Sequence, residues 1–68
     1  MTEFQRFIER AITRAGSVAA LSRATGHTVQ NIRKWRTGEI REPDRNSIRR
    51  LAQALGSSEA ELVQMVYG

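Results

Sequence analysis

The sequence predicts an all-α protein, a compact bundle of five short helices in one domain spanning residues 1–68. Three observations support this fold class. Apolar residues recur at three- and four-residue spacing in five segments. Four of these segments begin at a hydroxyl residue suited to a helix N-cap, and four end at a glycine. No segment alternates apolar and polar residues for long enough to indicate a strand.

The first helix is expected within residues 2–16. Thr2 and Gln5 have the spacing of a capping box, and Gly16 ends the segment. One side of this helix carries an apolar stripe that faces the core. The stripe consists of Phe4, Phe7, Ile8, Ala11, Ile12 and Ala15.

Two further short helices follow within residues 17–26 and 28–38. Ser17 and Thr28 are suitable N-caps, and the intervening glycine predicts a sharp turn with a left-handed backbone conformation. On the later helix, Ile32 and Trp35 follow Thr28 at the i+4 and i+7 positions, so this face is predicted to pack inward. The polar and cationic residues around them are then held on the outside.

Residues 39–44 lack helical periodicity and contain the only proline of the chain, so they are predicted to form a loop. A fourth helix is expected within residues 46–56, with its apolar residues on one face and Gly56 at its end. A fifth helix is expected after Ser58, which forms a second capping box with Glu61. Helices this short are marginal alone in water and require mutual packing.

Length and composition exclude several classes of protein. A chain of 68 residues, 40% hydrophobic and 26% charged, lies near the globular average and buries only a thin core. Cysteine is absent, which excludes disulfides and thiolate metal sites. No apolar run approaches the roughly 20 residues that a membrane span needs, and the N-terminal MTEFQRFIER is not a secretion signal. We therefore expect a cytoplasmic protein.

The charge is unevenly distributed along the chain. The net charge is +4, and residues 23–50 contain eight cationic and three acidic side chains, a net of +5. Residues 51–68 contain no cation and two glutamates, a net of −2. The basic segment favours contact with a polyanion such as nucleic acid, although charge alone leaves a merely solvated face as an equal alternative.

The segment SVAALSRATGHTVQNIRKWRTG, residues 17–38, resembles the helix-turn-helix of the lambda-repressor and Cro family of DNA-binding domains. The resemblance rests on a small residue in the first helix, Ser22, the turn glycine Gly26, and the apolar pair Ile32 and Trp35. It continues into PDRNSIRRLAQALGSSEAELV, similar to the later helices of phage repressors, and covers about residues 5 to 66. It implies a lambda-repressor-like five-helix bundle with a central helix-turn-helix at about residues 17–37.

The chain differs from this family pattern at three places. Ser22 stands where alanine is usual, and Thr25 and His27 stand where apolar residues more often flank the turn. Glu42 lies just before Pro43, where phage relatives often carry a basic residue that approaches phosphate. The first two differences are expected to leave the fold intact, whereas the third weakens the case for backbone contact by this loop.

The resemblance implies that the 28–37 helix enters the major groove of DNA, with its N-terminal residues at the base edges. Gln30 suits the paired donor and acceptor of adenine, and Asn31 suits adenine or a phosphate. Val29 matches a thymine methyl group, and Lys34 reaches guanine or a phosphate. The alternative for all four is simple solvation of an exposed helix.

Phosphate contacts are expected around this helix, and they set affinity and register rather than sequence choice. The N-terminus of the 17–26 helix is one such site, because its free N–H groups and dipole attract anions. For Ser17 and Thr28, helix capping without phosphate contact is an equal alternative. Arg49, Arg50 and the first-helix arginines are expected on solvated faces. The predicted phosphate-contacting residues are Ser17, Thr28, Arg33, Arg36, Thr37, Arg41 and Arg45.

His27 and Trp35 have two interpretations each. With no cysteine and no second histidine, His27 is predicted to be a partly buried turn residue rather than a metal ligand, with scope for a weak pH effect on DNA binding. Trp35 is predicted to be a core residue rather than a stacking platform for single strands, because its spacing from Ile32 places both on the same face.

The predicted function is sequence-specific binding of double-stranded DNA by a transcriptional regulator, most simply a Cro-like phage or prophage repressor. In the family that the chain resembles, the end of the domain often supplies a dimer contact. A homodimer on a near-palindromic operator is therefore expected, at least on DNA, with Met65 and Tyr67 of the last helix as its candidate contact. The alternative is that the last helix is an ordinary amphipathic helix. The alternatives are a small antitoxin-type autoregulator and a helical protein-interaction module. No catalytic set, cofactor site or small-molecule substrate site is predicted.

Overall fold

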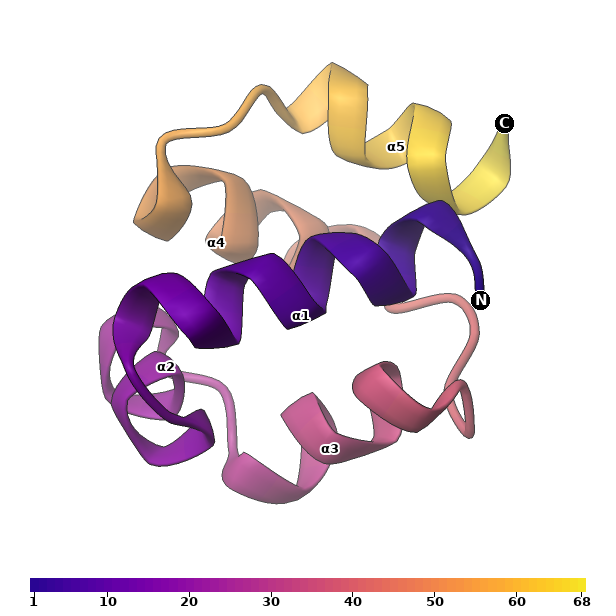
Figure 1. Ribbon diagram of the computed structural model, residues 1–68. Coiled ribbons are helices and arrows are strands. Elements are labelled where there is room, and N and C mark those ends of the chain that lie inside the picture. The colour runs from indigo at the N-terminus through magenta and orange to yellow at the C-terminus, as the bar shows by residue number, and fades with distance from the viewer.

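The computed structural model describes residues 1–68 and contains five α-helices and no strand, which confirms the predicted all-α fold class (Figure 1). The predicted segments contain the observed helices, except that the fourth begins one residue earlier than expected. Its N-cap is Asp44, whose carboxylate accepts a 3.0 Å hydrogen bond from the N–H of Ser47. The helices are α1 (Glu3–Ala15), α2 (Val18–Thr25), α3 (Val29–Thr37), α4 (Arg45–Leu55) and α5 (Glu59–Tyr67).

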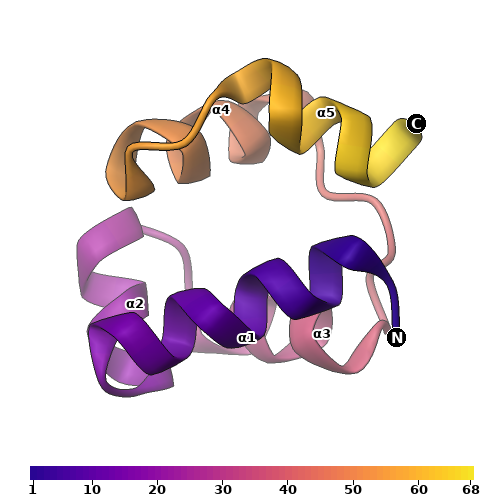
Figure 2. The ribbon, with the colours of Figure 1, turned by 45° about the horizontal axis from the view of Figure 1, so that its top comes forward.

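Helix α1 runs through the middle of the bundle and packs against α2, α3 and α5. In Figure 1, α3 lies on one side of α1 and the pair α4 and α5 lies on the other. Figure 2 shows α4 and α5 together above α1 and α3, which overlap in this view, with the two chain termini at one end. The arrangement leaves the outer face of α3 free of other helices.

The core is formed by apolar residues from all five helices. Several of the stripe residues predicted for α1 are buried, and Ile8 is fully so. Burying a side chain of this size contributes about 1.5–3 kcal/mol. The ten buried residues are Phe4, Ile8, Ala11, Leu21, Ile32, Trp35, Ile48, Leu51, Ala52 and Leu62.

The N-terminal cap of α1 also fastens α1 to α3. Thr2 and Gln5 form the predicted capping box, with the Thr2 Oγ1 accepting from the Gln5 N–H at 3.1 Å. The Gln5 amide nitrogen then donates a 3.1 Å bond to the carbonyl of Arg36 near the end of α3. The second predicted capping box is incomplete, because only the bond from the Glu61 N–H to Ser58 is present. None of the helices is long and apolar enough to traverse a bilayer.

Candidate nucleic-acid interface

Helix α3 has one buried and one exposed face. Ile32 is 0% and Trp35 is 2% exposed, which confirms the predicted inward face. The Trp35 ring meets the Phe4 ring edge to face, with centroids 6.1 Å apart, and the His27 ring at 4.9 Å. These two aromatic neighbours, one on α1 and one in the turn before α3, fix the rotation of α3 about its axis. The tryptophan therefore determines which side chains face solvent.

Of the four predicted base-contacting residues, Val29, Gln30 and Asn31 lie in the first turn of α3, and Lys34 lies in its last turn. Gln30 and Asn31 are exposed, whereas Val29 and Lys34 are half-buried. The Lys34 ammonium lies 3.7 Å from the Glu39 carboxylate, an exposed pair that stabilises little. The two amide side chains have no hydrogen-bond partner in the protein. They are the donors and acceptors of this face that are free for a ligand.

Two helix N-termini carry the predicted hydroxyl contacts. The Ser17 Oγ accepts from the Ala20 N–H at 3.0 Å, and the Thr28 Oγ1 accepts from the Asn31 N–H at 3.1 Å. Both residues therefore cap their helices. Each hydroxyl is used only as an acceptor, so its hydrogen stays available to a phosphate oxygen.

The predicted phosphate-contacting side chains differ in their surroundings. Arg33 and Arg41 are exposed and form no ion pair. Arg36 is paired with Glu9 of α1, and Arg45 lies over the Tyr67 ring at 5.7 Å.

Thr37 of the same predicted set has both hydrogen-bonding functions occupied. Its Oγ1 donates to the Lys34 carbonyl at 3.3 Å and accepts from the Glu39 N–H at 3.4 Å. Of the arginines predicted to contact phosphate, Arg33 and Arg41 have neither an ion pair nor an aromatic ring as a partner.

The turn between α2 and α3 is fastened by Arg50, which is exposed as expected but also bonds to the turn. Gly26 has φ +78°, and its carbonyl accepts a 2.9 Å bond from the Arg50 Nη2 of α4. Arg49, its neighbour, is also exposed and pairs with Glu59 at 3.7 Å. No periodic or capping signal distinguishes Arg50 from Arg49 in the sequence.

Three of the four residues that depart from the family pattern form one hydrogen-bonded group at the turn: Ser22, Thr25 and His27. The Ser22 Oγ donates to the His27 carbonyl at 2.6 Å. The Thr25 Oγ1 donates to the Leu21 carbonyl at 2.9 Å and accepts from the His27 N–H at 3.2 Å. The polar side chains therefore satisfy the backbone of the turn, which explains how Thr25 is buried there.

His27 is more deeply buried than its sequence position indicated, with 5% of its surface exposed. Its Nε2 has no hydrogen-bond partner. Burial is the main cause that lowers the pKa of His27 below 6.5, and the Arg50 guanidinium lowers the pKa further. The Ser47 backbone and the Asp44 carboxylate act in the opposite direction. The folded protein therefore holds His27 neutral near pH 7.

This burial predicts a loss of stability in mild acid. Because the pKa of His27 is lower in the folded than in the unfolded state, the unfolded state binds more protons below about pH 6.5. The contribution of neutral His27 to the free energy of unfolding should be complete above that pH, and it should be lost as the pH falls through the pKa of the folded state. Urea denaturation at several pH values measures it. His27→Gln, which does not titrate, should flatten this part of the profile, and an equally steep profile would contradict the assignment.

The C-terminal residues predicted to contact a second protomer are used within one chain. The Tyr67 hydroxyl donates a 2.9 Å bond to the Pro43 carbonyl, and the ring carries Arg45 on its face. Tyr67 remains 44% exposed, whereas Met65 is half-buried and packs against the core. Tyr67 therefore fastens α5 to the loop before α4.

The fold and the exposed face of α3 together define a helix-turn-helix protein. The family model described as a Cro/C1-type helix-turn-helix DNA-binding domain matches residues 6–67. The chain therefore belongs to the Cro/C1-type family of DNA-binding domains. No curated protein and no solved structure matches it significantly. No group of histidine, cysteine, aspartate or glutamate residues is arranged to hold a metal ion.

Proposed function

We propose that the protein is a Cro-like repressor of phage or prophage type, with residues 1–68 as one domain and residues 17–37 as its helix-turn-helix. It occupies a near-palindromic operator at the nucleoid, with α3 in the major groove. One observation carries this proposal: burial of Ile32 and Trp35 holds the unpartnered amides of Gln30 and Asn31 rigidly outward. An α-helix with its side chains is about 10–12 Å across, which suits a major groove about 12 Å wide.

The side chains of this face have distinct roles in the proposal. Gln30 binds an adenine edge through both amide atoms, and Asn31 binds a second base or a phosphate. Val29 contacts a thymine methyl group. Lys34 exchanges its weak partner Glu39 for a guanine or phosphate oxygen, since an exposed ion pair costs little to open.

Phosphate binding in the proposal depends chiefly on Arg33 and Arg41, the arginines of the set that have neither an ion pair nor an aromatic ring as a partner. The N-terminus of α2 adds its free N–H groups and the Ser17 hydroxyl. The other predicted residues bind phosphate after they give up their present contacts within the protein. They are Thr28, Arg36, Thr37 and Arg45.

Two copies bind the operator in this proposal, each with its α3 in one half-site. Half-sites then lie about 34–36 Å apart, one helical turn of DNA. Tyr67 and Met65 lie on α5. The exposed edge of the Tyr67 ring is the surface that α5 offers to a second protomer. The contact forms at least on DNA.

The proposal is tested by selecting duplexes from a random pool at moderate salt and sequencing the bound fraction. An enriched palindrome supports the dimeric operator, and its half-site spacing gives the dimer geometry. An enriched single half-site keeps the role of α3 and removes the dimer. Retention of all sequences without enrichment contradicts the proposal and favours the protein-interaction module instead.

Gln30→Ala should reduce affinity for the selected duplex by roughly 1–3 kcal/mol and relax the preference at one base pair. Truncation removes a bidentate contact while leaving the core face of α3 untouched. Titrations of the cognate duplex and of its single-base variants measure both effects. Gln53→Ala, an exposed glutamine of α4, is the matched control. Equal weakening on cognate and random duplexes would mean that Gln30 does not contact a base.

Arg41→Ala should weaken binding to all duplexes by a similar factor. One phosphate contact fewer reduces the slope of log affinity against log salt by about 1. Titrations across a salt series on cognate and random duplexes measure the slope. Arg14→Ala, in which an equally exposed and unpaired arginine of α1 is lost, should leave the slope unchanged. A sequence-dependent loss from Arg41→Ala would indicate base contact instead.

A further inference from the structure

A groove to which α3 contributes no residue has a lining that suits a ligand. It has a volume of about 500 Å³ and is lined by residues of α1, α2, α4, α5 and the α4–α5 connection. Pockets that hold small molecules have volumes of about 300–1,000 Å³ and mostly apolar walls. Eight of the twelve lining residues are hydrophobic. The groove therefore matches a small ligand in both volume and lining.

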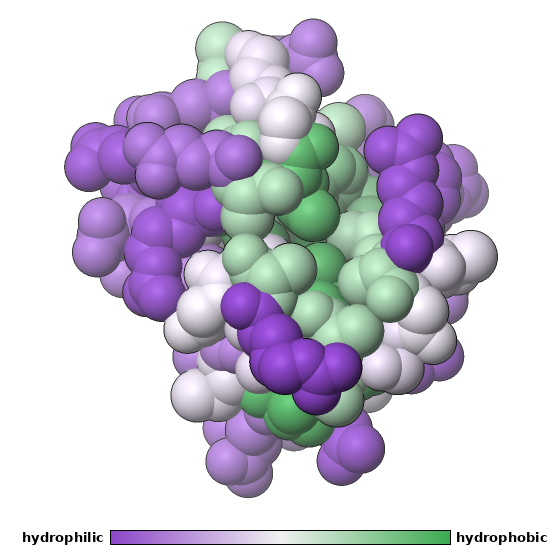
Figure 3. All heavy atoms as spheres, turned by 90° about the vertical axis from the view of Figure 1, so that its left-hand side faces the viewer, coloured by the Kyte–Doolittle hydropathy of each residue, from purple (hydrophilic) through white to green (hydrophobic).

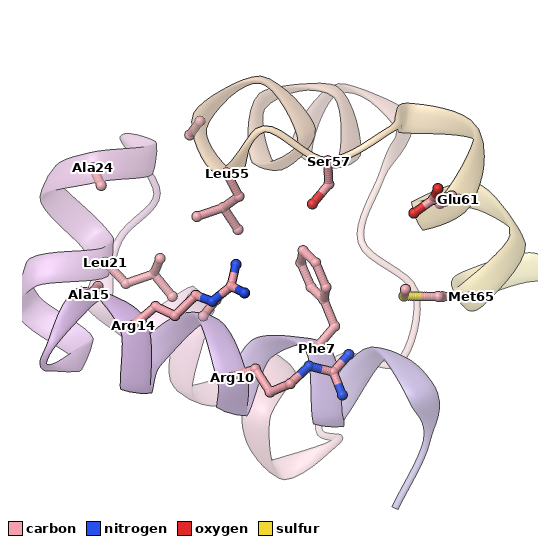
Figure 4. A pocket seen from close by; sticks show the side chains of 12 residues that line it. Phe7, Arg10, Arg14, Ala15, Leu21, Ala24, Leu55, Ser57, Glu61 and Met65 are labelled. Carbon is pink, nitrogen blue, oxygen red and sulfur yellow. The ribbon is translucent and has the colours of Figure 1, made fainter.

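The floor of the groove is apolar and continuous with the core. Leu21 is fully buried beneath it, while Phe7, Leu55 and Met65 are half-buried and form its walls. Figure 4 shows the Phe7 ring and the Leu55 side chain directed into the space from opposite helices. Figure 3 shows apolar side chains gathered between hydrophilic ones on the side where α2 lies. Ligand atoms on this floor would leave water, which is favourable.

The edge of the groove carries two cations without partners. Arg10 and Arg14 are one turn apart on α1, both line the groove, and neither forms an ion pair. Figure 4 places the Arg14 guanidinium at the mouth of the space. The planar donor fork of arginine matches a carboxylate. The groove therefore offers a site for one anionic group beside an apolar body.

The opposite wall limits the charge of the ligand. Glu61 lies there, also unpaired, and Ser57 presents a hydroxyl that makes no hydrogen bond in the protein. Figure 4 shows both side chains facing the space from the α4–α5 side. A second carboxylate on the ligand would meet Glu61 and be repelled. The walls thus favour a single negative charge on the arginine side.

We infer that this groove binds a small amphipathic monocarboxylate, with the carboxylate on Arg10 and Arg14 and an acyl or aryl-alkyl body along the apolar floor. The stretch of α1 from Phe7 to Ala15 that lines the groove is about 12 Å long, which suits a medium-chain acid. Because α3 contributes no lining residue, the acid and the duplex occupy separate sites.

Decanoate, used below its critical micelle concentration, is the probe for this site. Methyl signals of Ala24, Ala54 and Met65 should shift on titration, because all three line the groove. Arg14→Gln should weaken decanoate binding by about fivefold, the effect of one exposed charged contact. Arg6→Gln is the matched control, since Arg6 lies one turn before Arg10 on α1 but outside the groove. A saturating duplex should not displace decanoate.

Two further ligands separate the charged and apolar contributions. Decanol should bind without any dependence on Arg14, and decanedioate should bind more weakly than decanoate because of Glu61. Ala54→Leu places a larger side chain in the groove from an exposed helix position, so the fold should persist while decanoate binding is lost.

Three results would overturn the inference. An equal loss from Arg6→Gln and Arg14→Gln would indicate a diffuse response to positive charge. Displacement of decanoate by the duplex would place the probe on the DNA-binding surface. Methyl shifts that persist unchanged in Ala54→Leu would place it elsewhere on the protein.

Discussion

Trp35→Ala should unfold much of the protein at room temperature. Removing a buried indole costs about 3–5 kcal/mol, through lost apolar burial and through the cavity that remains. A chain of 68 residues has a free energy of unfolding of only about 3–10 kcal/mol. The loss includes the edge-to-face contacts with Phe4 and His27, which connect α3 to α1 and to the turn.

Circular dichroism during urea denaturation measures this effect without depending on tryptophan fluorescence. Trp35→Phe is the control, since a smaller ring on the same face keeps contact with Phe4 and should preserve the fold at reduced stability. Gln30→Ala should unfold like the original protein. A folded Trp35→Ala protein that had lost only DNA affinity would place the indole on the DNA-binding surface.

The helices could be predicted from the sequence because each carries local signals. Ser17 and Thr28 cap their helices as expected, and the spacing of Ile32 and Trp35 correctly indicated the inward face of α3. Asp44 was not expected as the N-cap of α4, although aspartate is one of the favoured N-cap residues. These features depend on neighbours within about one turn of the chain.

Contacts between distant elements could not be predicted in the same way. Arg50 bonds to Gly26 across 24 residues, and Gln5 bonds to Arg36 across 31 residues. Each is a side chain bound to a backbone carbonyl, so the partner has no distinguishing side chain in the sequence. Tyr67 illustrates the same difficulty, since its bond to the Pro43 carbonyl fastens a residue that was predicted to face a second protomer.

The candidate site likewise combines features that the local sequence predicts with contacts between distant elements that it does not. The exposed face of α3 follows from helical spacing, which was enough to identify Gln30 as an outward-facing amide. The ionic surroundings could not be identified in this way, because Glu9 pairs with Arg36 from another helix. The charge available to phosphate is therefore concentrated on fewer side chains than the sequence indicates.

Gly26→Ala should destabilise the protein by about 2–3 kcal/mol, the second largest effect. A non-glycine residue at φ +78° costs about 1–2 kcal/mol. An added Cβ would also lie 2.7 Å from the Arg50 Nη2, so the guanidinium must leave the carbonyl that it binds. Gly56→Ala is the matched control, because Gly56 has φ +66° with no atom within 4 Å of an added Cβ. It should show the backbone cost alone.

A double-mutant cycle with Arg50→Ala isolates the contact that holds the turn. Arg50→Ala alone should cost about 1 kcal/mol, the usual value for a hydrogen bond of this kind. In the Arg50→Ala background, Gly26→Ala should cost no more than Gly56→Ala, since the guanidinium that obstructed the methyl group is gone. The two losses would then sum to more than the double variant shows. Strict additivity would mean that the methyl group of Gly26→Ala does not disturb the bond from Arg50 to this carbonyl.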